Sequence, residues 1–421
     1  MIKSIKLQTF ASRIFLIFAG FACLILFFFF AKWCFANALA EKADTKEIAE
    51  MMVDLAPSDP QTHHSLAVLS EKTFLPEDLP KALAEYERAT VLSPDDYRFW
   101  YALGKARERN GDAPGAESAL RKALELAPNY AQVQWALGNI LLRQGKTDEG
   151  FFEIRRAAEG DAKFANPTVS SAWQIFDGDL AQVKQNIGNS AQTNSALATF
   201  LAKQKRFDEA IEIWNPLPAE EKKTALNPSG KELFREMLAA KRFRDALQIE
   251  IEIGETENFA AGKLFNGGFE TEVKTKDASV FEWQIADGLQ PQIGFDDREK
   301  RGGNRSLVVV FNSATGKDFR SIFQTIVVES GKSYRFEMFY KADLKTAATL
   351  KWEIVDAASD KILAATGSIL ANSDWTNLQA EFTAPETTQA VVLRLAREGC
   401  KSGICPIAGK VWLDDFSVIQ Q

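Results

Sequence analysis

Few residues of this 421-residue chain have the types and spacing that catalysis requires. Its two histidines, His63 and His64, are adjacent, and the chain contains no Gly-x-Ser-x-Gly elbow, phosphate-binding loop or His-Glu-x-x-His motif. The segment Cys400-Lys-Ser-Gly-Ile-Cys405 places two thiols close together. In an oxidising compartment this loop could close as a disulfide, and the alternative is two free thiols. We therefore predict that the protein is not an enzyme and needs no catalytic cofactor.

The N-terminal residues predict where the protein is located. Residues 14–31 are 18 consecutive uncharged residues that end in a run of phenylalanines. A helix of this length spans roughly 27 Å, close to the hydrocarbon thickness of a bilayer. Lys3, Lys6 and Arg13 precede the run and acidic residues begin at Glu41, so the N-terminus is expected in the cytoplasm. The sequence predicts a single-pass inner-membrane protein with most of its chain on the extracytoplasmic, periplasmic side.

A cleaved signal peptide is the main alternative to an anchor. Ala36-Asn37-Ala38 has the small-x-small pattern of a cleavage site. The apolar run is longer than that of a typical signal peptide, and Lys32 and Trp33 are typical of a membrane interface, which favours the anchor. Lipidation at Cys23 or Cys34 is a third option. All three interpretations place the rest of the chain outside the cytoplasm.

Composition limits the classes of fold and partner. The chain is 25% charged and 46% hydrophobic, as expected for a globular protein. About 380 residues follow the predicted anchor, enough for two or three domains. The net charge is −7 and no basic block follows the N-terminus. Because binding to phosphates needs clustered Lys and Arg, we predict no nucleic-acid partner.

A motif of leucine, a small residue and proline recurs in the first half of the chain. It occurs as Leu55-Ala56-Pro57, Leu92-Ser93-Pro94 and Leu126-Ala127-Pro128, at spacings of 37 and 34 residues. Between these motifs, Gly104 and Ala116 recur 34 residues later as Gly138 and Gly150, and such small residues let two helices approach closely. These residues resemble the tetratricopeptide repeat, a pair of short amphipathic helices that stacks into an α-solenoid.

The resemblance implies protein partners. In such solenoids the first helix of each pair lines a groove that binds a peptide or a helix. The residues at these positions are Arg98, Tyr101, Lys105, Gln132 and Asn139. His63 aligns with Trp100 of the next repeat, so we interpret the two histidines as packing or solvated residues.

Weaker repeats follow in the next hundred residues. Lys205-Arg206-Phe207 and Lys241-Arg242-Phe243 are 36 residues apart, and each follows an apolar helical stretch. The unit Arg-Phe-x-x-Ala that includes the last two residues of each triplet resembles the start of a second repeat helix. We therefore predict degenerate helical repeats up to about residue 258.

From about residue 259 onward the hydrophobic pattern alternates. Tyr334 and Phe336, for example, alternate with Arg335 and Glu337. Seven or eight such short segments are separated by turn-forming residues. This spacing predicts a single antiparallel β-sandwich.

Four motifs of the sandwich resemble jelly-roll carbohydrate-binding modules of the xylan- and glucan-binding kind. They are Asn266-Gly-Gly-Phe-Glu270, Gly303-Asn-Arg-Ser-Leu307, Gly331-Lys-Ser-Tyr334 and the closing pair Asp414-Asp415. The resemblance implies a structural calcium ion held by Glu270 and Asp414, with Asp415 as the alternative ligand, or else carboxylates that cap turns and face solvent. Trp283 and Trp375 have loop-like contexts and could stack on a sugar ring, or anchor the loops that close the sandwich.

These features predict an α + β multidomain chain with four parts. The parts are a cytoplasmic stub and transmembrane anchor (1–40), tetratricopeptide repeats (41–165), degenerate helical repeats (166–258) and a sandwich similar to carbohydrate-binding modules (259–421). We hypothesise a scaffold that binds cell-envelope proteins through its repeats, in envelope or exopolysaccharide assembly, with a sandwich that contacts polysaccharide or a second protein. The alternatives are a glycan-binding protein whose solenoid is a spacer, or an enzyme acting on polysaccharide.

Overall fold

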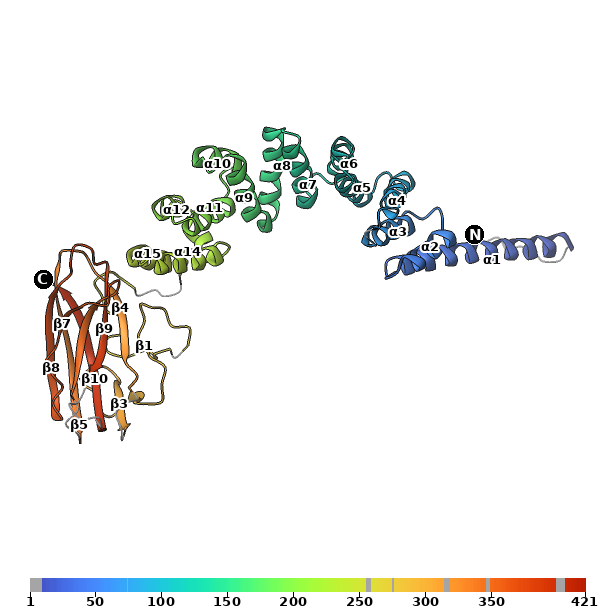
Figure 1. Cartoon of the computed structure of the whole chain (residues 1–421). Coiled ribbons are helices and arrows are strands. Elements are labelled where there is room, and N and C mark those ends of the chain that lie inside the picture. Colours follow the sequence, from blue (N-terminus) through green and yellow to red (C-terminus); the bar gives the residue numbers. More distant parts are fainter. Residues whose placement is uncertain are drawn as a thin grey trace, which may run out of the picture. The chain divides into compact units, whose positions relative to one another are not determined.

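The computed structural model describes residues 10–73, 75–254, 259–274, 276–313, 319–345, 349–398 and 406–421. The chain forms two compact units, Met1–Thr193 and Asn194–Gln421. Helices occupy the chain up to Ile253, and two antiparallel sheets follow (Figure 1). The predicted fold class is therefore confirmed: an N-terminal apolar helix, an array of helix pairs and a β-sandwich.

The first unit consists of helices. They are α1 (Phe10–Ala40), α2 (Lys46–Leu55), α3 (Pro60–Lys72), α4 (Asp78–Leu92), α5 (Tyr97–Arg109), α6 (Ala113–Leu126), α7 (Ala131–Arg143), α8 (Thr147–Gly160), the short 3-10 helix η1 (Ala162–Phe164), α9 (Ala165–Ile175) and α10 (Leu180–Ile187). The pairs α3/α4, α5/α6 and α7/α8 pack against each other most extensively, and each pair also contacts the next (Figure 1). These three pairs are the repeats that the proline spacing predicts.

Close packing within each pair depends on small residues. A Cβ atom on Gly104 would lie 2.6 Å from Cγ of Leu120, and one on Gly138 would lie 2.8 Å from the carbonyl oxygen of Gly150. No side chain fits at either distance without movement of the opposite helix. The glycines that mark the repeat in the sequence are therefore the points at which the two helices of a pair touch.

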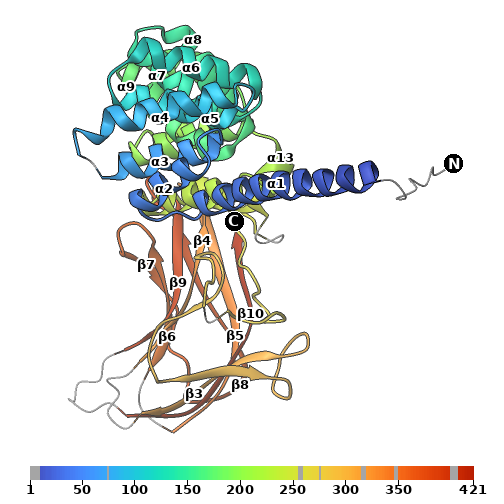
Figure 2. The ribbon, with the colours of Figure 1, turned by 90° about the vertical axis from the view of Figure 1, so that its right-hand side faces the viewer.

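Helix α1 differs from the other helices in its exposure. Apolar side chains are exposed over most of its length. Arg13–Ala40 is long and apolar enough to cross a bilayer, and α1 is one long uninterrupted helix (Figure 2). No other helix among the described ranges meets this condition. Length and composition alone do not distinguish a membrane anchor from a signal sequence.

The second unit begins with the remaining helices, which together with α9 and α10 of the first unit occupy the region predicted as degenerate repeats (166–258). They are α11 (Ala191–Lys203), which begins just before the unit boundary, α12 (Phe207–Trp214), α13 (Ala219–Lys223), α14 (Asn227–Ala239) and α15 (Phe243–Ile253). A Cβ atom on Gly230 would lie 2.4 Å from Cγ2 of Ile253. The close approach of α14 and α15 thus uses a glycine in the same way as the regular repeats.

Two five-stranded sheets form the sandwich. The strands are β1 (Gln284–Ile285), β2 (Gln292–Asp296), β3 (Ser306–Ser313), β4 (Ile322–Val327), β5 (Ser333–Leu344), β6 (Leu350–Asp356), β7 (Ile362–Ala365), β8 (Asn372–Thr383), β9 (Ala390–Arg397) and β10 (Ile407–Gln420). One sheet has the order β1-β4-β9-β6-β7 and the other β2-β3-β10-β5-β8. All pairings are antiparallel, and the alternating apolar residues of both sheets face each other.

Aromatic rings fill the centre of the sandwich. The ring of Phe416 lies 4.9 Å from that of Trp352 and 5.1 Å from that of Trp283, measured between centroids. Phe269 and Phe336 complete the group at 5.5 and 6.1 Å from Phe416. All five residues belong to one buried cluster that includes strands of both sheets. This cluster joins the opening segment of the domain, which contains Phe269 and Trp283, to its last strand, which contains Phe416.

Within the second unit, α14 and α15 pack on the sandwich. Arg244 of α15 donates hydrogen bonds to the carbonyl oxygen of Val328 at 3.2 Å and to Oγ of Ser330 at 2.8 Å. Oε2 of Glu250 accepts a hydrogen bond from Oγ of Ser279 at 2.8 Å. The last helix pair and the sandwich therefore form one packed body rather than two modules joined only by a linker.

Candidate binding surfaces

The predicted groove residues of the repeats lie on α5 and α7, two first helices that contact each other. Arg98, Tyr101 and Lys105 are spaced three and four residues apart, so they share one face of α5. Gln132 and Asn139 occupy the positions of Arg98 and Lys105 one repeat later. The side chain of Arg98 is exposed, and the other four are half-buried. The structure therefore places Arg98 and Lys105 at positions equivalent to those of Gln132 and Asn139, with Tyr101 on the same face of α5.

Local contacts hold these side chains in place. The guanidinium of Arg98 pairs with Asp96 at 2.6 Å, and Lys105 pairs with Glu108. Asn139 donates from Nδ2 to the carbonyl oxygen of Trp135 on its own helix at 2.8 Å. Helices α5 and α7 thus present polar side chains that are already ordered. Less side-chain conformational entropy is then lost when a partner binds.

Of the aromatic residues of this surface, the sequence prediction included Tyr101 but missed His64 and Trp135. His64, Tyr101 and Trp135 are equivalent residues of three successive first helices, since they are separated by the same 37 and 34 residues as the proline motifs. All three are half-buried. Burial raises the pKa of the Tyr101 hydroxyl, and burial together with nearby Arg98 lowers the pKa of His64, so both are neutral at pH 7. The repeat spacing itself is the signal that could have identified them.

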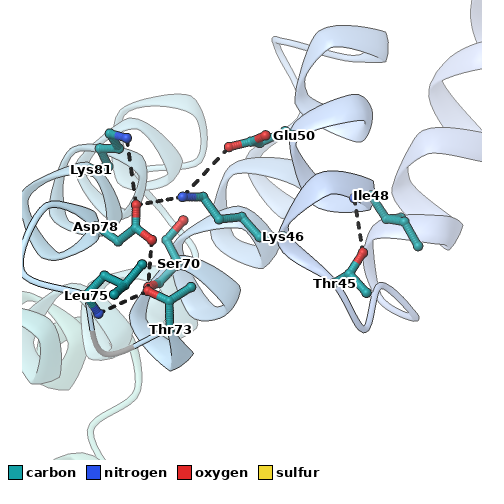
Figure 3. Close-up of polar contacts among 9 residues, drawn as sticks. All are labelled: Thr45, Lys46, Ile48, Glu50, Ser70, Thr73, Leu75, Asp78 and Lys81. Atoms are coloured by element: carbon teal, nitrogen blue, oxygen red, sulfur yellow. Dashed lines mark hydrogen bonds and ion pairs between the residues drawn. The ribbon is translucent and has the colours of Figure 1, made fainter.

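A buried carboxylate fixes the loop that makes the first repeat longer than the others (Figure 3). Oδ1 of Asp78 accepts a hydrogen bond from Nζ of Lys46 at 2.6 Å, and Oδ2 accepts one from Oγ1 of Thr73 at 2.8 Å. The bond from Lys46 lowers the pKa of Asp78 and raises the pKa of Lys46. The three residues come from α2, the end of α3 and the start of α4, so we assign this network a structural role.

In the sandwich, Trp283 is a core residue. It is 1% exposed, and its Nε1 donates to the carbonyl oxygen of Asn266 at 3.1 Å. Its ring contacts Phe269, Trp352 and Phe416. The prediction that Trp283 stacks on a sugar is wrong for this structure, because both ring faces are covered by protein. The alternative, a tryptophan that anchors the opening segment, describes its position.

Trp375 lies on strand β8 in a β-bulge. Tyr340 of β5 pairs with Thr376 and Ala342 pairs with Ser373, so Asp374 and Trp375 together oppose the single residue Lys341. Such bulges change the direction of a side chain and are common near binding sites. Trp375 is half-buried, so part of its ring is available to a ligand.

Polar residues lie on the outer face of the same sheet, next to the bulge that contains Trp375. Lys341 donates to Oε2 of Glu299 at 3.0 Å, which raises the pKa of Lys341, and lies 3.5 Å from Oδ1 of Asp374. Next to Lys341, on β10, Trp412 donates from Nε1 to Oδ2 of Asp296 at 2.9 Å, which lowers the pKa of Asp296. The alternation on β10 could have predicted that Trp412 faces outward, since its neighbours Val411 and Leu413 both face the core.

The predicted calcium ligands converge on one loop, residues 301–304. Asp414 is fully buried: Oδ2 accepts from the backbone nitrogens of Arg301 and Gly302 at 2.9 and 3.1 Å. Glu270 accepts from the backbone and the amide of Asn304 at 2.9 and 2.8 Å, and the bond to the backbone is the main reason that the pKa of Glu270 is lowered.

These hydrogen bonds determine what the carboxylates can hold. Asp415 forms an ion pair with Arg301, so Glu270, Asp414 and Asp415 all bind the same loop. No group of three or more metal-ligating side chains was found within the described ranges. The carboxylates therefore fit the loop rather than a cation in this arrangement, and calcium binding by Glu270 and Asp414 stays a prediction.

The predicted disulfide between Cys400 and Cys405 lies outside the described residues. Of the cysteines that the structure describes, Cys23 and Cys34 are both free and exposed on α1.

Comparison with protein families identifies both binding modules. Residues 77–131 and 108–163 match the model described as a tetratricopeptide repeat, and residues 261–398 match the model described as a carbohydrate binding domain. Both resemblances proposed from the sequence are thus confirmed. The two matched domains are of non-catalytic kinds.

Curated relatives match only a small part of the chain. A cell division cycle protein 27 homolog of Caenorhabditis elegans is 27% identical over 97 residues, which are 23% of this chain and 12% of that protein. The BBSome complex member bbs-4 of the same organism is 33% identical over 95 residues, 22% of this chain and 19% of its own. The chain therefore spans less than a fifth of the length of either relative.

Two solved structures are similar to parts of the chain. A structure described as "CBM4 structure and function" is 17% identical and covers 38% of this chain and 99% of its own, with a TM-score of 0.30. A structure of MamA protein is 15% identical and covers 55% of this chain and 98% of its own, with a TM-score of 0.29.

Proposed function

We propose that this protein is a membrane-anchored extracytoplasmic scaffold that binds protein partners through its repeats and a glycan through its sandwich. The observation that carries the proposal is the presence of two modules of binding kinds in one chain with one exposed apolar helix. We place its role in assembly of the cell envelope or of an exopolysaccharide, with α1 in the inner membrane and the N-terminus in the cytoplasm.

The surface of the first helices supports protein binding. Half-buried Tyr101 shares a face of α5 with exposed Arg98, and half-buried Trp135 has the position of Tyr101 on α7. These residue types dominate the binding energy of protein interfaces. The ion pairs of Arg98 and Lys105 keep the cations at fixed positions on α5. A partner segment that displaces Asp96 or Glu108 with its own carboxylates would be held in register with the aromatic side chains.

The outer face of the sandwich supports glycan binding. A half-exposed indole offers an apolar face to the C–H groups of a pyranose, while Lys341 and Asp374 beside it can donate and accept hydrogen bonds to hydroxyl groups. Trp375 is the ring we assign to this role in place of Trp283. Both proposed roles, protein binding and glycan binding, require no catalysis, and we propose that the protein is not an enzyme.

Charge reversals on the repeats test the protein-binding half of the proposal. Full-length protein in native membranes is compared with the double variant Arg98→Glu, Lys105→Glu and with Lys184→Glu, an exposed control on α10 of the same unit. We expect the double variant to lose co-purifying envelope proteins and the control to retain them. Retention of the partners by the double variant would contradict this half.

A polysaccharide binding measurement tests the other half. We expect Trp375→Ala to weaken binding of the full chain to a soluble xylan or glucan roughly tenfold, the loss of about one stacking contact, and Gln379→Ala on the same strand to have no effect. Glycan binding without any protein partner would favour the alternative in which the solenoid is a spacer. Release of shortened polysaccharide would identify an enzyme and overturn the proposal.

A further inference from the structure

Helix α1 does not end where its apolar run ends. It continues without interruption to Ala40, and Ala36 and Ala40 are 0% and 2% exposed, whereas the apolar side chains of the preceding run are exposed. Ala36 and Ala40 form one buried cluster with Met52 of α2 and with Ala56, the residue that follows α2. The last turns of the helix are therefore packed as a core element of the repeats.

Hydrogen bonds attach the same turns to α3. The amide of Asn37 donates from Nδ2 to both carboxylate oxygens of Asp59, at 3.1 and 2.9 Å. Asp59 is 1% exposed and caps α3, because its Oδ1 also accepts from the backbone nitrogen of Gln61. Ser65 donates from Oγ to the carbonyl oxygen of Ala40 at 2.7 Å. Without α1, the buried carboxylate of Asp59 would lose its side-chain partner, which is costly.

The sequence of α2 indicates why this helix needs α1. It ends at Leu55-Ala56-Pro57, the same motif that ends α4 and α6, which are second helices of their repeats. A second helix buries its apolar side against a helix that precedes it, because a single short amphipathic helix cannot cover its own apolar face. The helix that precedes α2 is α1.

We infer that the last turns of α1, residues 36–40, are part of the repeat array, so that the N-terminal helix is retained in the mature protein and joins the repeats without a flexible linker. Cleavage after Ala38, the site that the small-x-small pattern predicts, would cut inside this packed turn and remove Ala36 and Asn37.

The inference deepens the proposed function, since it rests on the placement of α1 in a membrane. Ala36 lies five residues beyond Ala31, so roughly 8 Å of helix separate the apolar run from the array. The repeat array therefore begins next to the bilayer.

Two substitutions within the small-x-small pattern form a matched test in the full chain. Ala36→Leu and Ala38→Leu add the same side chain, but Ala36 is buried and Ala38 is exposed. We expect the protein purified from native membranes to retain α1 by intact mass in the wild type and in both variants. We expect the Tm of the repeats to fall by several degrees in Ala36→Leu and to stay unchanged in Ala38→Leu.

A milder variant keeps the test decisive if Ala36→Leu does not fold. Asn37→Ala removes the donor to Asp59 and should lower the Tm, whereas Asn186→Ala, which removes a bond within α10 only, should leave it unchanged. A wild-type chain that begins at Leu39, with a longer chain in Ala38→Leu, would overturn the inference. So would equal Tm values for Asn37→Ala and its control. A protein that retains α1 but is extracted by carbonate would instead contradict only the membrane placement.

Discussion

Trp100 donates a hydrogen bond from its indole Nε1 to the carbonyl oxygen of Pro94 at 2.7 Å. The equivalent residues of the neighbouring repeats do the same. His63 Nε2 lies 2.9 Å from the carbonyl oxygen of Pro57, and Gln134 donates from Nε2 to that of Pro128 at 2.8 Å. Three different side chains thus bind the equivalent proline carbonyl oxygen of three repeats, at the turn that joins successive repeats. The common requirement is a donor that reaches six residues back, not an aromatic ring.

This contact predicts how Trp100 can be replaced. Trp100→Phe keeps an aromatic ring but removes the donor, and should destabilise the repeats by about 1 kcal/mol. Trp100→Gln, the residue used in the next repeat, should restore the bond to Pro94. Hydrogen exchange of the α5 amides in the full chain measures the difference. Equal protection in the wild type and Trp100→Phe would show that the bond contributes nothing.

The glycine contacts predict opposite effects for two glycine-to-alanine substitutions in the repeats. Gly138→Ala forces a Cβ atom to 2.8 Å from the carbonyl oxygen of Gly150, and should cost about 1–3 kcal/mol by overpacking. Gly160→Ala at the end of α8 meets only Cβ of Ala131 at 3.6 Å, an ordinary contact, and should be neutral or stabilising by up to about 1 kcal/mol. Thermal unfolding of both variants tests whether position 138 lacks room for a Cβ atom and position 160 has it.

The network around Asp78 predicts a dependence of stability on pH. The bond from Lys46 lowers the folded-state pKa of Asp78 below its ordinary value of 3.8. Its contribution is therefore fully present above about pH 4 and is lost as the pH falls through the lowered value. Asp78→Asn should lower the Tm at pH 7 and reduce the loss of Tm in acid. A variant with the same acid profile as the wild type would exclude Asp78 as the group responsible.

The repeats and the sandwich were predictable because their signals are local. Gly104, Gly138 and the prolines mark helix contacts and turns at a fixed period, and the alternation around Tyr334 marks a strand. The position of Trp283 was not predictable, since its loop-like neighbours do not reveal that the chain folds its ring into the core.

Long-range hydrogen bonds account for the other differences. Asp414 is more than a hundred residues from Arg301 in the sequence, and only the fold shows that its carboxylate binds the backbone of that loop. The packing of Asn37 on Asp59 is likewise invisible in the apolar run that suggests a membrane helix.

The loop around Arg301 predicts that the sandwich is stabilised without a metal. Asp414→Asn replaces one acceptor oxygen by an amide among three backbone donors, and should destabilise the sandwich by about 1–3 kcal/mol. A Tm of the wild type that is the same with calcium and with a chelator would show that these hydrogen bonds stabilise the sandwich without an ion. A Tm that rises with calcium and no longer does so in Asp414→Asn would instead establish the ion that the family resemblance implies.

The contacts of Arg244 predict that α15 and the sandwich unfold together. Arg244→Ala removes the donor to Val328 and Ser330 and should lower the stability of the second unit by about 1 kcal/mol. Arg235→Ala, at an exposed position of α14, is the matched control and should have no effect. Calorimetry of the full chain should show one transition for α14, α15 and the sandwich in the wild type. If the helices and the sandwich unfold separately in the wild type, their packing is too weak to couple them.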